Sequence, residues 1–278
     1  MARLRRADGG DVALRIVASG GKGRELAIRY AAVAEFQQSR SLARLPAAID
    51  VVERGLPSLD AMDGLFATSM EWIAGPTLLQ GIDRAANAGN VEVIRALSAA
   101  FIQFWNDMQK VEFVHGDYTA QNLVVRSNGQ LACVDLDGAA WNDAPFGPTG
   151  QGTPGYRHPT VFRDATLRDA FAALLIVTSL AVLADVPELR SLYGDPASTI
   201  DGSLLFSAWD LADPSTSRAF AEATARVTAP TRALLEGLQG ACAGNALDVY
   251  DACALLPRMR MPAPASMEST SVRSGWDV

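Results

Sequence analysis

The chain has 278 residues, which is long enough for one large domain or for two packed lobes. Hydrophobic residues make up 49% of the sequence, enough for a sizeable core, so the composition argues against a disordered chain. The formal net charge of −7 argues against nucleic acid as a partner, because an acidic protein repels phosphate backbones.

The N-terminal part of the sequence is rich in strand-like segments. Four apolar segments predict strands near Val12–Ala18, Glu25–Ala31, Ile49–Val52 and Leu65–Met70. The glycine-rich sequence SGGKGR between the first two predicts a hairpin turn. Residues 32–45 predict a helix with Val33, Phe36 and Leu42 on one side. Residues 1–70 are therefore expected to form a small β-rich lobe with one helix.

A short linker at residues 71–76, closed by Gly75-Pro76, separates this lobe from a helical region. Beyond the linker, apolar residues at three- and four-residue steps predict one face of a long helix: Ile94, Leu97, Phe101, Trp105 and Met108. A small β patch interrupts the helices, with short apolar runs at Phe113–His115, Asn122–Val125 and Leu131–Asp135.

After residue 165 the pattern predicts helices to about Met261, followed by a polar, proline-containing tail at 262–278 that we expect to be disordered. Residues 77–261 are thus expected to form a larger helical lobe. The fold class predicted from this order is α+β and bilobal, with a ligand cleft between the lobes.

The sequence also bears on the compartment. The longest apolar run, Ala170–Ala184, is shorter than the about 20 residues that a membrane span needs, so it predicts a buried core helix. Cys133, Cys242 and Cys253 are odd in number and widely spaced, which argues against a disulfide framework or a zinc site. We therefore expect a cytoplasmic protein that does not bind a membrane.

The strongest chemical signal is the segment HGDYTAQNLVV, from His115 to Val125, followed by VDLDG at Val134–Gly138. Phosphoryl transfer needs a group that accepts the proton of the attacking hydroxyl, and oxygen ligands for magnesium. Asp117 can accept the proton, while Asn122 and Asp135 can offer oxygens from the two strands of one hairpin. The alternative is that these residues are turn carboxylates and an asparagine cap.

These spacings resemble the catalytic and metal loops of the protein-kinase superfamily. The sequence GTPGYRHP at 152–159 resembles the end of a kinase activation loop. Together, the HGDxxxxN, VDxDG and GxPxYxHP motifs resemble a family of bacterial Ser/Thr-protein-kinase-like proteins. The resemblance implies ATP and Mg²⁺ as cofactors, a protein substrate or regulatory partner, and von Willebrand A or phosphatase proteins as possible partners.

The same resemblance implies supporting roles around the catalytic loop. His115 is expected to support the loop, and Thr153 to form a hydrogen bond near Asp117. Asp169, at the expected start of the buried helix, should accept hydrogen bonds from the catalytic-loop backbone. Gly116 stands where many protein kinases have an arginine that pairs with a phosphorylated loop, so loop phosphorylation is not expected to be the on-switch.

The nucleotide-binding residues are expected in the first lobe and the linker. MEWIAGPTL resembles a kinase hinge, which implies that the backbone of Glu71, Trp72 and Ile73 binds adenine. Arg29, in LAIRY, is expected to replace the strand lysine that holds the phosphates, the alternative being a solvated strand arginine. Gly9-Gly10 is the candidate for a minimal glycine lid.

Three functions remain open at this point. The intact set of Asp117, Asn122 and Asp135 favours an active Ser/Thr protein kinase. Arginine in place of the strand lysine and the reduced glycine loop motivate a pseudokinase, a module that binds nucleotide or a partner without turnover. HGD in the catalytic loop motivates a small-molecule kinase of the aminoglycoside type, against which GTPGYRHP argues.

Overall fold

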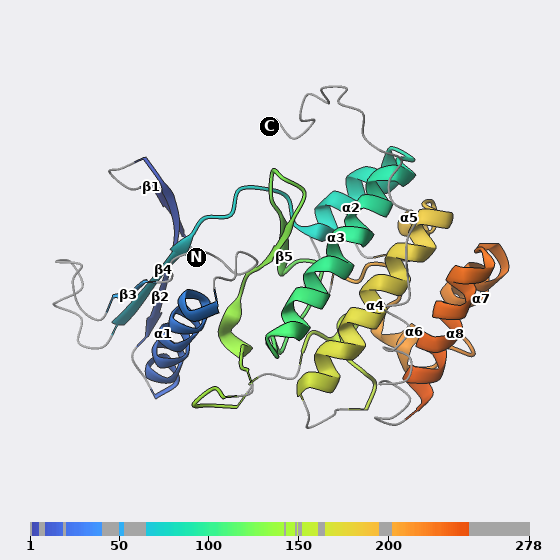
Figure 1. Cartoon of the computed structure of the whole chain (residues 1–278). Coiled ribbons are helices and arrows are strands. Elements are labelled where there is room, and N and C mark those ends of the chain that lie inside the picture. Colours follow the sequence, from blue (N-terminus) through green and yellow to red (C-terminus); the bar gives the residue numbers. More distant parts are fainter. Residues whose placement is uncertain are drawn as a thin grey trace.

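The structure is a computed structural model of the chain. It describes residues 2–5, 9–18, 21–40, 50–52, 65–141, 143–147, 149, 152–160, 165–194 and 202–244. The architecture is α+β, with a small antiparallel sheet and one helix on one side and a mostly helical part on the other (Figure 1). A two-stranded hairpin lies between them in this view. The class expected from the sequence is confirmed.

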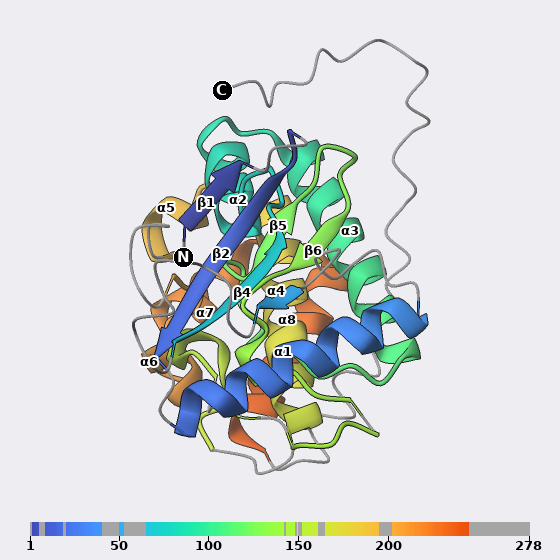
Figure 2. The ribbon, with the colours of Figure 1, turned by 90° about the vertical axis from the view of Figure 1, so that its left-hand side faces the viewer.

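The N-terminal part is a four-stranded sheet covered by a long helix. Its elements are β1 (Ala2–Arg5), β2 (Asp11–Ala18), α1 (Gly21–Arg40), β3 (Asp50–Val52) and β4 (Leu65–Glu71). The strand order is β1-β2-β4-β3, with every neighbouring pair antiparallel. Helix α1 packs on β3 and β4, and in Figure 2 it runs below β2 and β4, obliquely to their direction.

One predicted strand, Glu25–Ala31, is wrong, because these residues lie within helix α1. The glycines of SGGKGR do not make a hairpin, since Gly21 is the first residue of the helix. The helical period was present in the sequence: Ala27, Tyr30 and Val33 are buried at three-residue steps, whereas Ile28 is 54% exposed. The helix predicted over 32–45 is right as far as Arg40, and its last residues lie outside the described part.

The C-terminal part begins with two helices, α2 (Leu78–Asn87) and α3 (Val91–Lys110). The hairpin strands β5 (Leu123–Val125) and β6 (Leu131–Cys133) follow, with two 3₁₀ turns, η1 (Leu136–Gly138) and η2 (Pro154–Tyr156). The remaining helices are α4 (Ala165–Asp185), α5 (Leu189–Tyr193), α6 (Ala208–Ala212), α7 (Arg218–Arg226) and α8 (Ala229–Ala243).

Local sequence explains where these helices begin and what they bury. Thr77 caps α2 in a capping box with Gln80, and Asn90 caps α3. The predicted face of α3 is buried: Ile94, Leu97, Phe101, Trp105 and Met108. Residues 170–184 of α4 are buried on all sides, as expected for a core helix. Among the described helices, none is long and apolar enough to span a membrane.

The hairpin and the linker are joined by a close backbone contact. Gly75 has φ of +151°, and a Cβ at this position would lie 1.9 Å from the Val125 carbonyl oxygen, so only glycine fits. The Val125 N–H also donates to the Pro76 carbonyl at 2.9 Å. The linker is thereby fixed to β5. The predicted strand at Phe113–His115 is reduced to a single bridge between Val114 and Ala140.

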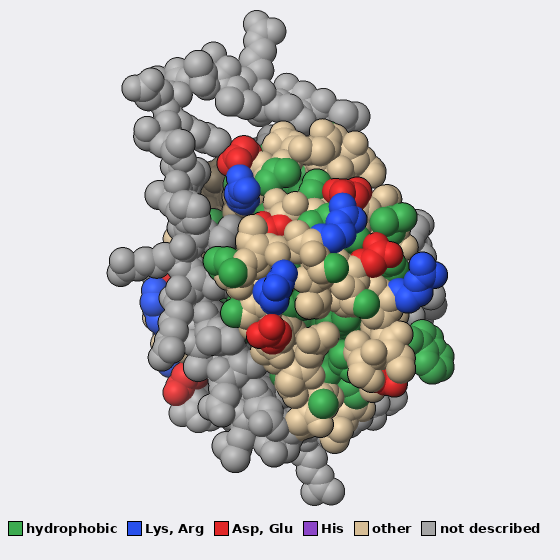
Figure 3. Space-filling model, turned by 90° about the vertical axis from the view of Figure 1, so that its right-hand side faces the viewer, with side chains coloured by type: hydrophobic (Ala, Val, Ile, Leu, Met, Phe, Trp, Pro, Cys, Tyr) green, Lys and Arg blue, Asp and Glu red, His purple; other side chains and the backbone are tan. Residues whose placement is uncertain are grey.

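Figure 3 shows the helical end of the molecule, where acidic and basic side chains are interspersed among other atoms. The described surface of this face has no broad patch of one charge. The predicted tail at 262–278 and the predicted helix end near Met261 lie outside the described residues.

Candidate active site

Asp117 lies on a loop between α3 and β5, and buried polar contacts hold this loop on both sides. The Asp169 carboxylate of α4 accepts hydrogen bonds from the N–H groups of His115 (2.6 Å) and Gly116 (3.0 Å). Asp169 is 2% exposed, and burial raises its pKa to about 7, although the two N–H groups favour the charged form. The sequence placed Asp169 at the start of this helix, but α4 begins at Ala165, so Asp169 lies in its second turn.

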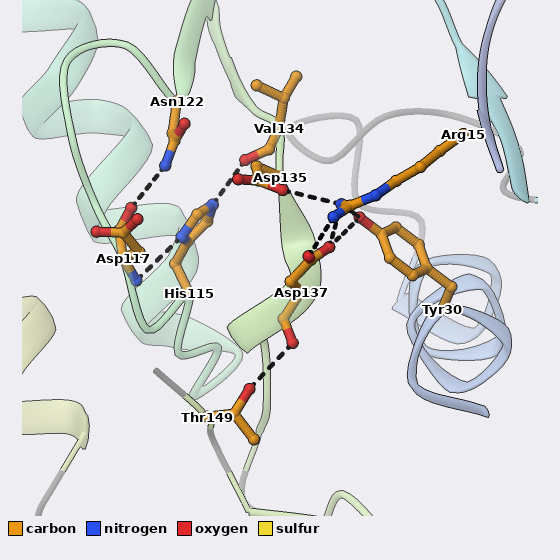
Figure 4. Close-up of polar contacts among 9 residues, drawn as sticks. All are labelled: Arg15, Tyr30, His115, Asp117, Asn122, Val134, Asp135, Asp137 and Thr149. Atoms are coloured by element: carbon orange, nitrogen blue, oxygen red, sulfur yellow. Dashed lines mark hydrogen bonds and ion pairs between the residues drawn. The ribbon is translucent and has the colours of Figure 1, made fainter. Parts of the chain in front are cut away.

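The His115 ring supports the loop from the side of the hairpin (Figure 4). Its Nδ1 accepts from the Asp117 N–H at 3.3 Å, so its Nε2 carries the proton that is donated to the Val134 carbonyl at 2.9 Å. Burial lowers the pKa of His115 and so favours the neutral ring, although the hydrogen bond with the Val134 carbonyl acts in the opposite direction. His115 therefore connects the loop to the strand that leads to Asp135.

Gly116 has a structural reason to be glycine. Its φ is +84°, and a Cβ there would lie 3.0 Å from the Gly138 carbonyl oxygen and 3.1 Å from that of Thr149. The loop that carries Asp117, which we call the catalytic loop, thus packs directly on the backbone of the metal loop, Val134–Gly138. An arginine at this position would be strained as well as crowded.

Asn122 and Thr153 orient the two ends of Asp117. The Asn122 amide donates from Nδ2 to the Asp117 carbonyl at 3.0 Å, which leaves its Oδ1 as a possible ligand. The Asp117 carboxylate accepts from the Thr153 N–H at 2.8 Å and from the Thr153 hydroxyl at 3.2 Å. The contact expected between Thr153 and Asp117 is present.

Asp135 follows β6 and has a left-handed backbone, with φ of 62° and ψ of 62°. Such a conformation is strained in a residue other than glycine, and strain of this kind clusters at functional sites. The Val134 N–H donates to the Asn122 carbonyl at 2.8 Å, so the hairpin brings Asn122 and Asp135 close, as predicted. Burial, and then the charge of Asp137, raise the pKa of Asp135, while Arg15 opposes this.

The cation that faces these carboxylates is Arg15 of β2, which the sequence reasoning missed. Its guanidinium forks onto Asp137, with one hydrogen bond of 2.6 Å from NH2 to Oδ2 and a shorter one from NH1 to Oδ1. NH1 also lies 3.1 Å from Asp135 Oδ1. Tyr30, from α1, donates its hydroxyl proton to Asp137 Oδ1 at 2.8 Å.

Two carboxylates and an amide oxygen suit a hard cation such as Mg²⁺, which commonly uses one or two protein carboxylates together with substrate phosphates. The residues that fit this role are Asn122 and Asp135, with Asp137 beside them. The guanidinium of Arg15 already demonstrates that the two aspartates attract a cation. Among the described residues, neither this site nor any other place brings together three or more His, Cys, Asp or Glu side chains suited to a metal, so the site offers two carboxylates and one amide oxygen at most.

The model of the phosphotransferase enzyme family (APH) matches residues 2–145, just over half of the chain. This range contains Arg15, the catalytic loop and the metal loop. The chain belongs to the phosphotransferase enzyme family. The likeness to the kinase-like superfamily is thereby confirmed, while the narrower likeness to bacterial Ser/Thr kinases stays a prediction. A comparison with curated proteins gave no match.

Arg29 of this phosphotransferase does not lie on a strand, contrary to the prediction, but on α1. Its side chain is 2% exposed and donates from NH1 to the carbonyls of Ala139 (2.9 Å) and Gly147 (3.0 Å). The guanidinium also lies 4.2 Å from the ring centroid of Phe146. Arg29 therefore holds the segment after the metal loop, and neither the phosphate contact nor the solvated alternative describes it.

A signal for Arg15 was available in the sequence. Val12-Ala13-Leu14-Arg15 matches the V-A-I-K pattern of the kinase phosphate-binding strand, with arginine for lysine. The strand predicted at Glu25–Ala31 puts the phosphate-binding position at Arg29, whereas these residues are helical in the structure. Once the helix is recognised, β2 is the strand that precedes it.

The linker residues have defined neighbours. The Glu71 carboxylate forms a paired ion contact with Arg126, at 3.0 and 3.1 Å. The Trp72 N–H donates to the Asp11 carbonyl at 3.1 Å, so this donor is used by the sheet rather than offered to adenine. Ile73 is 8% exposed and packs with Val124 and Ala132 from the hairpin. The binding of adenine to this linker stays a prediction.

The proposed glycine lid is not supported by its position. Gly9 and Gly10 precede β2 next to Asp11, which pairs with Trp72 of the linker. Arg15 lies five residues beyond Gly10, which is about 17 Å along an extended strand. The glycine turn is therefore at the linker end of β2, away from the carboxylates that would attract the phosphate-bound metal.

Proposed function

We propose that this phosphotransferase uses Mg·ATP and transfers the γ-phosphate to a hydroxyl group, with Asp117 as the proton acceptor. The observation that carries the proposal is the convergence of Asp117, Asn122 and Asp135 beside a strand arginine that crosses from the other lobe. This is the set of groups that phosphoryl transfer requires: a base, oxygen ligands for magnesium and a cation for the phosphates.

The residues act on the reaction in distinct ways. The acceptor oxygen forms a bond to the γ-phosphorus, the bond from phosphorus to the β–γ bridging oxygen breaks, and ADP leaves with that oxygen. Asp117 receives the proton of the hydroxyl, and Asn122 holds the Asp117 backbone in place. Arg15 offers a planar, permanently charged fork to the phosphate oxygens. Bound Mg²⁺ would supply neutralisation of the developing charge.

The contact of Thr153 with Asp117 favours a protein hydroxyl as the acceptor. Through it, the segment 152–160 is fixed beside the base. We infer a Ser/Thr protein substrate, because an ordered segment beside the base gives an extended peptide a surface to lie on. The second candidate acceptor is a small hydroxylated molecule, because the family match covers Asp117, Asn122 and Asp135 but ends at residue 145, before this segment.

The main experiment measures transfer from labelled ATP with Mg²⁺, using a mixture of serine- and threonine-containing proteins and a panel of small hydroxylated molecules. Asp117→Asn is expected to lower the transfer rate about 100-fold or more, while Mg·ATP affinity changes less than about threefold. Asp107→Asn, at a half-buried position of α3 where Asp107 pairs with Lys110, is the matched control and should transfer at the wild-type rate. Equal rates for Asp117→Asn and wild type would refute the role of Asp117.

A second experiment separates an active enzyme from a pseudokinase. Asp135→Ala is expected to weaken Mg-dependent nucleotide binding far more than Asn128→Ala, which alters only the hairpin turn. If the wild-type protein binds Mg·ATP but transfers phosphate to nothing, including water, the pseudokinase function is correct. Label on protein or on a small molecule decides between the two acceptor classes.

We also propose a reducing compartment such as the cytoplasm. Cys133 and Cys242, the two cysteines within the described residues, are both free and buried. A protein substrate or a regulatory partner, including the von Willebrand A and phosphatase proteins that the sequence resemblance implies, would be found by affinity capture with the Asp117→Asn variant, which retains nucleotide.

A further inference from the structure

The phosphate-facing arginine has an unusual set of partners. Arg15 NH1 lies 3.3 Å from the Tyr30 hydroxyl, which in turn donates to Asp137 at 2.8 Å, while the guanidinium itself forks onto Asp137. The three side chains form a closed triangle between β2, α1 and η1 (Figure 4). Tyr30 and Arg15, which precede Asp137 by 107 and 122 positions in the sequence, meet at its carboxylate.

In protein kinases a glutamate of the helix holds the strand cation. Helix α1 contains two acids, and neither is placed to do so. Glu25 is 62% exposed at its side chain and lies 3.4 Å from Arg29, and Glu35 is exposed. At the position that faces Arg15 the helix presents the neutral Tyr30, which is 0% exposed. The acid that holds the arginine comes from the metal loop.

The choice of a hydroxyl has a physical reason. Asp135 and Asp137 already place two negative charges around one guanidinium, and a third carboxylate from α1 would be repelled by both. The tyrosine hydroxyl gives Asp137 a hydrogen bond without adding charge. Burial and the Asp137 charge both raise the pKa of Tyr30, so the hydroxyl stays neutral.

We propose that Tyr30 is a positioning residue that fixes Asp137, and that Asp137 replaces the helix glutamate in aiming Arg15 at the nucleotide phosphates. This rests on the proposed function for its consequence, but not for its geometry. The metal loop then carries both a metal ligand, Asp135, and the support of the phosphate-binding cation. Helix α1 reaches the phosphates through one uncharged hydroxyl.

The test is the substitution Tyr30→Phe, which removes the hydroxyl and keeps the buried ring. We expect the affinity for Mg²⁺ with a non-hydrolysable ATP analogue, measured by calorimetry, to fall about 3- to 10-fold. Tyr193→Phe is the matched control: Tyr193 is the last residue of α5 in the helical part, and its hydroxyl forms a hydrogen bond with Glu222. Its affinity should equal that of the wild type.

The route through Asp137 is tested in the Asp137→Asn background. If Tyr30 acts by fixing Asp137, Tyr30→Phe should weaken binding no further there. Wild-type affinity in Tyr30→Phe, or an equal loss with and without Asp137→Asn, would overturn the inference.

Melting temperatures without nucleotide keep the inference separate from the proposed function. The double variant Tyr30→Phe/Arg15→Met is expected to lower the melting temperature by about 2 °C less than the two single variants do when their shifts are added. The reason is that both substitutions remove contacts of the same triangle. Additive shifts would overturn the positioning role even if the protein binds ATP. Failure of the wild-type protein to bind Mg·ATP, with non-additive shifts, would refute the proposed function and leave the triangle intact.

Discussion

The two sides of the site are held together in different ways. The loop that carries Asp117 is anchored by buried contacts, from the Asp169 carboxylate to two backbone N–H groups and from the His115 ring to Val134. Arg15 is held by side-chain ion pairs in which the Asp135 and Asp137 carboxylates are 49% and 37% exposed. Water and salt can weaken the second set of contacts but hardly reach the first.

This difference suits the two roles that we propose for these residues. A proton acceptor has to be in place before the acceptor hydroxyl arrives, so its loop is fixed by groups that ligands do not displace. A phosphate-binding cation has to take up phosphate oxygens beside the carboxylate that aims it, so its contacts are partly exposed side chains that can adjust. The anchor is therefore expected to dominate stability, and the Arg15 contacts to dominate sensitivity to solution conditions.

The largest effect is expected from removing the anchor. Asp169→Ala leaves the N–H groups of His115 and Gly116 buried without their acceptor, which should cost about 3–5 kcal/mol of unfolding free energy. Glu92→Ala is the control, since Glu92 is 75% exposed at its side chain and forms an ion pair with Arg95, one turn further along α3. Its cost should stay below about 0.5 kcal/mol in chemical denaturation. Similar losses for both variants would show that Asp169 anchors nothing.

Protonation of Asp169 gives the next effect. Burial raises its pKa to about 7 in the folded protein, whereas the pKa in the unfolded chain is about 3.9. The folded protein thus binds this proton more tightly than the unfolded chain does. The protonated carboxyl therefore contributes fully to the unfolding free energy below about pH 4, and this contribution is lost as the pH rises to about 7. Relative to Asp169→Asn, the wild-type unfolding free energy should fall by up to about 1.4 kcal/mol per pH unit in that window. A difference that is constant with pH would contradict this.

Salt should separate the two sides. Raising the ionic strength from about 0.05 to 0.5 M is expected to lower the wild-type unfolding free energy by about 0.5–1 kcal/mol through the contacts of Arg15. This salt-induced fall in unfolding free energy should be smaller in Arg15→Met, which keeps the apolar stem of the side chain. In Asp169→Asn it should be as large as in the wild type. An Arg15→Met protein with the full wild-type salt dependence would place the screened charges elsewhere.

The smallest effect compares two buried tyrosines. The Tyr118 ring stacks on His115, and its buried hydroxyl finds no hydrogen-bond partner among the described residues, unlike that of Tyr30. Tyr118→Phe is therefore expected to be neutral or to stabilise by up to about 1 kcal/mol, while Tyr30→Phe destabilises by about 1 kcal/mol. Thermal and chemical denaturation check both, and a clear loss for Tyr118→Phe would reveal a partner for its hydroxyl.

The same difference between the Asp117 loop and the Arg15 contacts explains which site residues could be predicted from the sequence. Asp117, Asn122 and Asp135 belong to one loop and one hairpin, so their spacing along the chain reports their spacing in space. The buried helix α4 was readable for a similar reason, because its apolar run is continuous. These features depend on neighbours in sequence or on a motif of fixed length.

The Arg15 contacts could not be read in this way. Their members come from β2, α1 and η1, and no local pattern links Arg15, Tyr30 and Asp137. The wrongly predicted strand at Glu25–Ala31 also favours Arg29 over Arg15, because the apolar neighbours of Arg29 fit a strand as well as a helix face over so few residues. The helical period distinguishes the two structures only over the whole of 21–40.

The close contact at Gly75 also determines how the two lobes can move. Because the linker is fixed to β5 from Gly75 onward, any rotation of the sheet has its pivot before that residue, near Ile73. The strand β4 ends just before this pivot, so a rotation moves the far end of the strand most. Two ionic contacts span the gap on either side, Glu71 with Arg126 close to the pivot and Arg15 with Asp137 further out. Opening of the lobes would stretch the outer contact first, so the phosphate end of the cleft opens wider than the end at the linker.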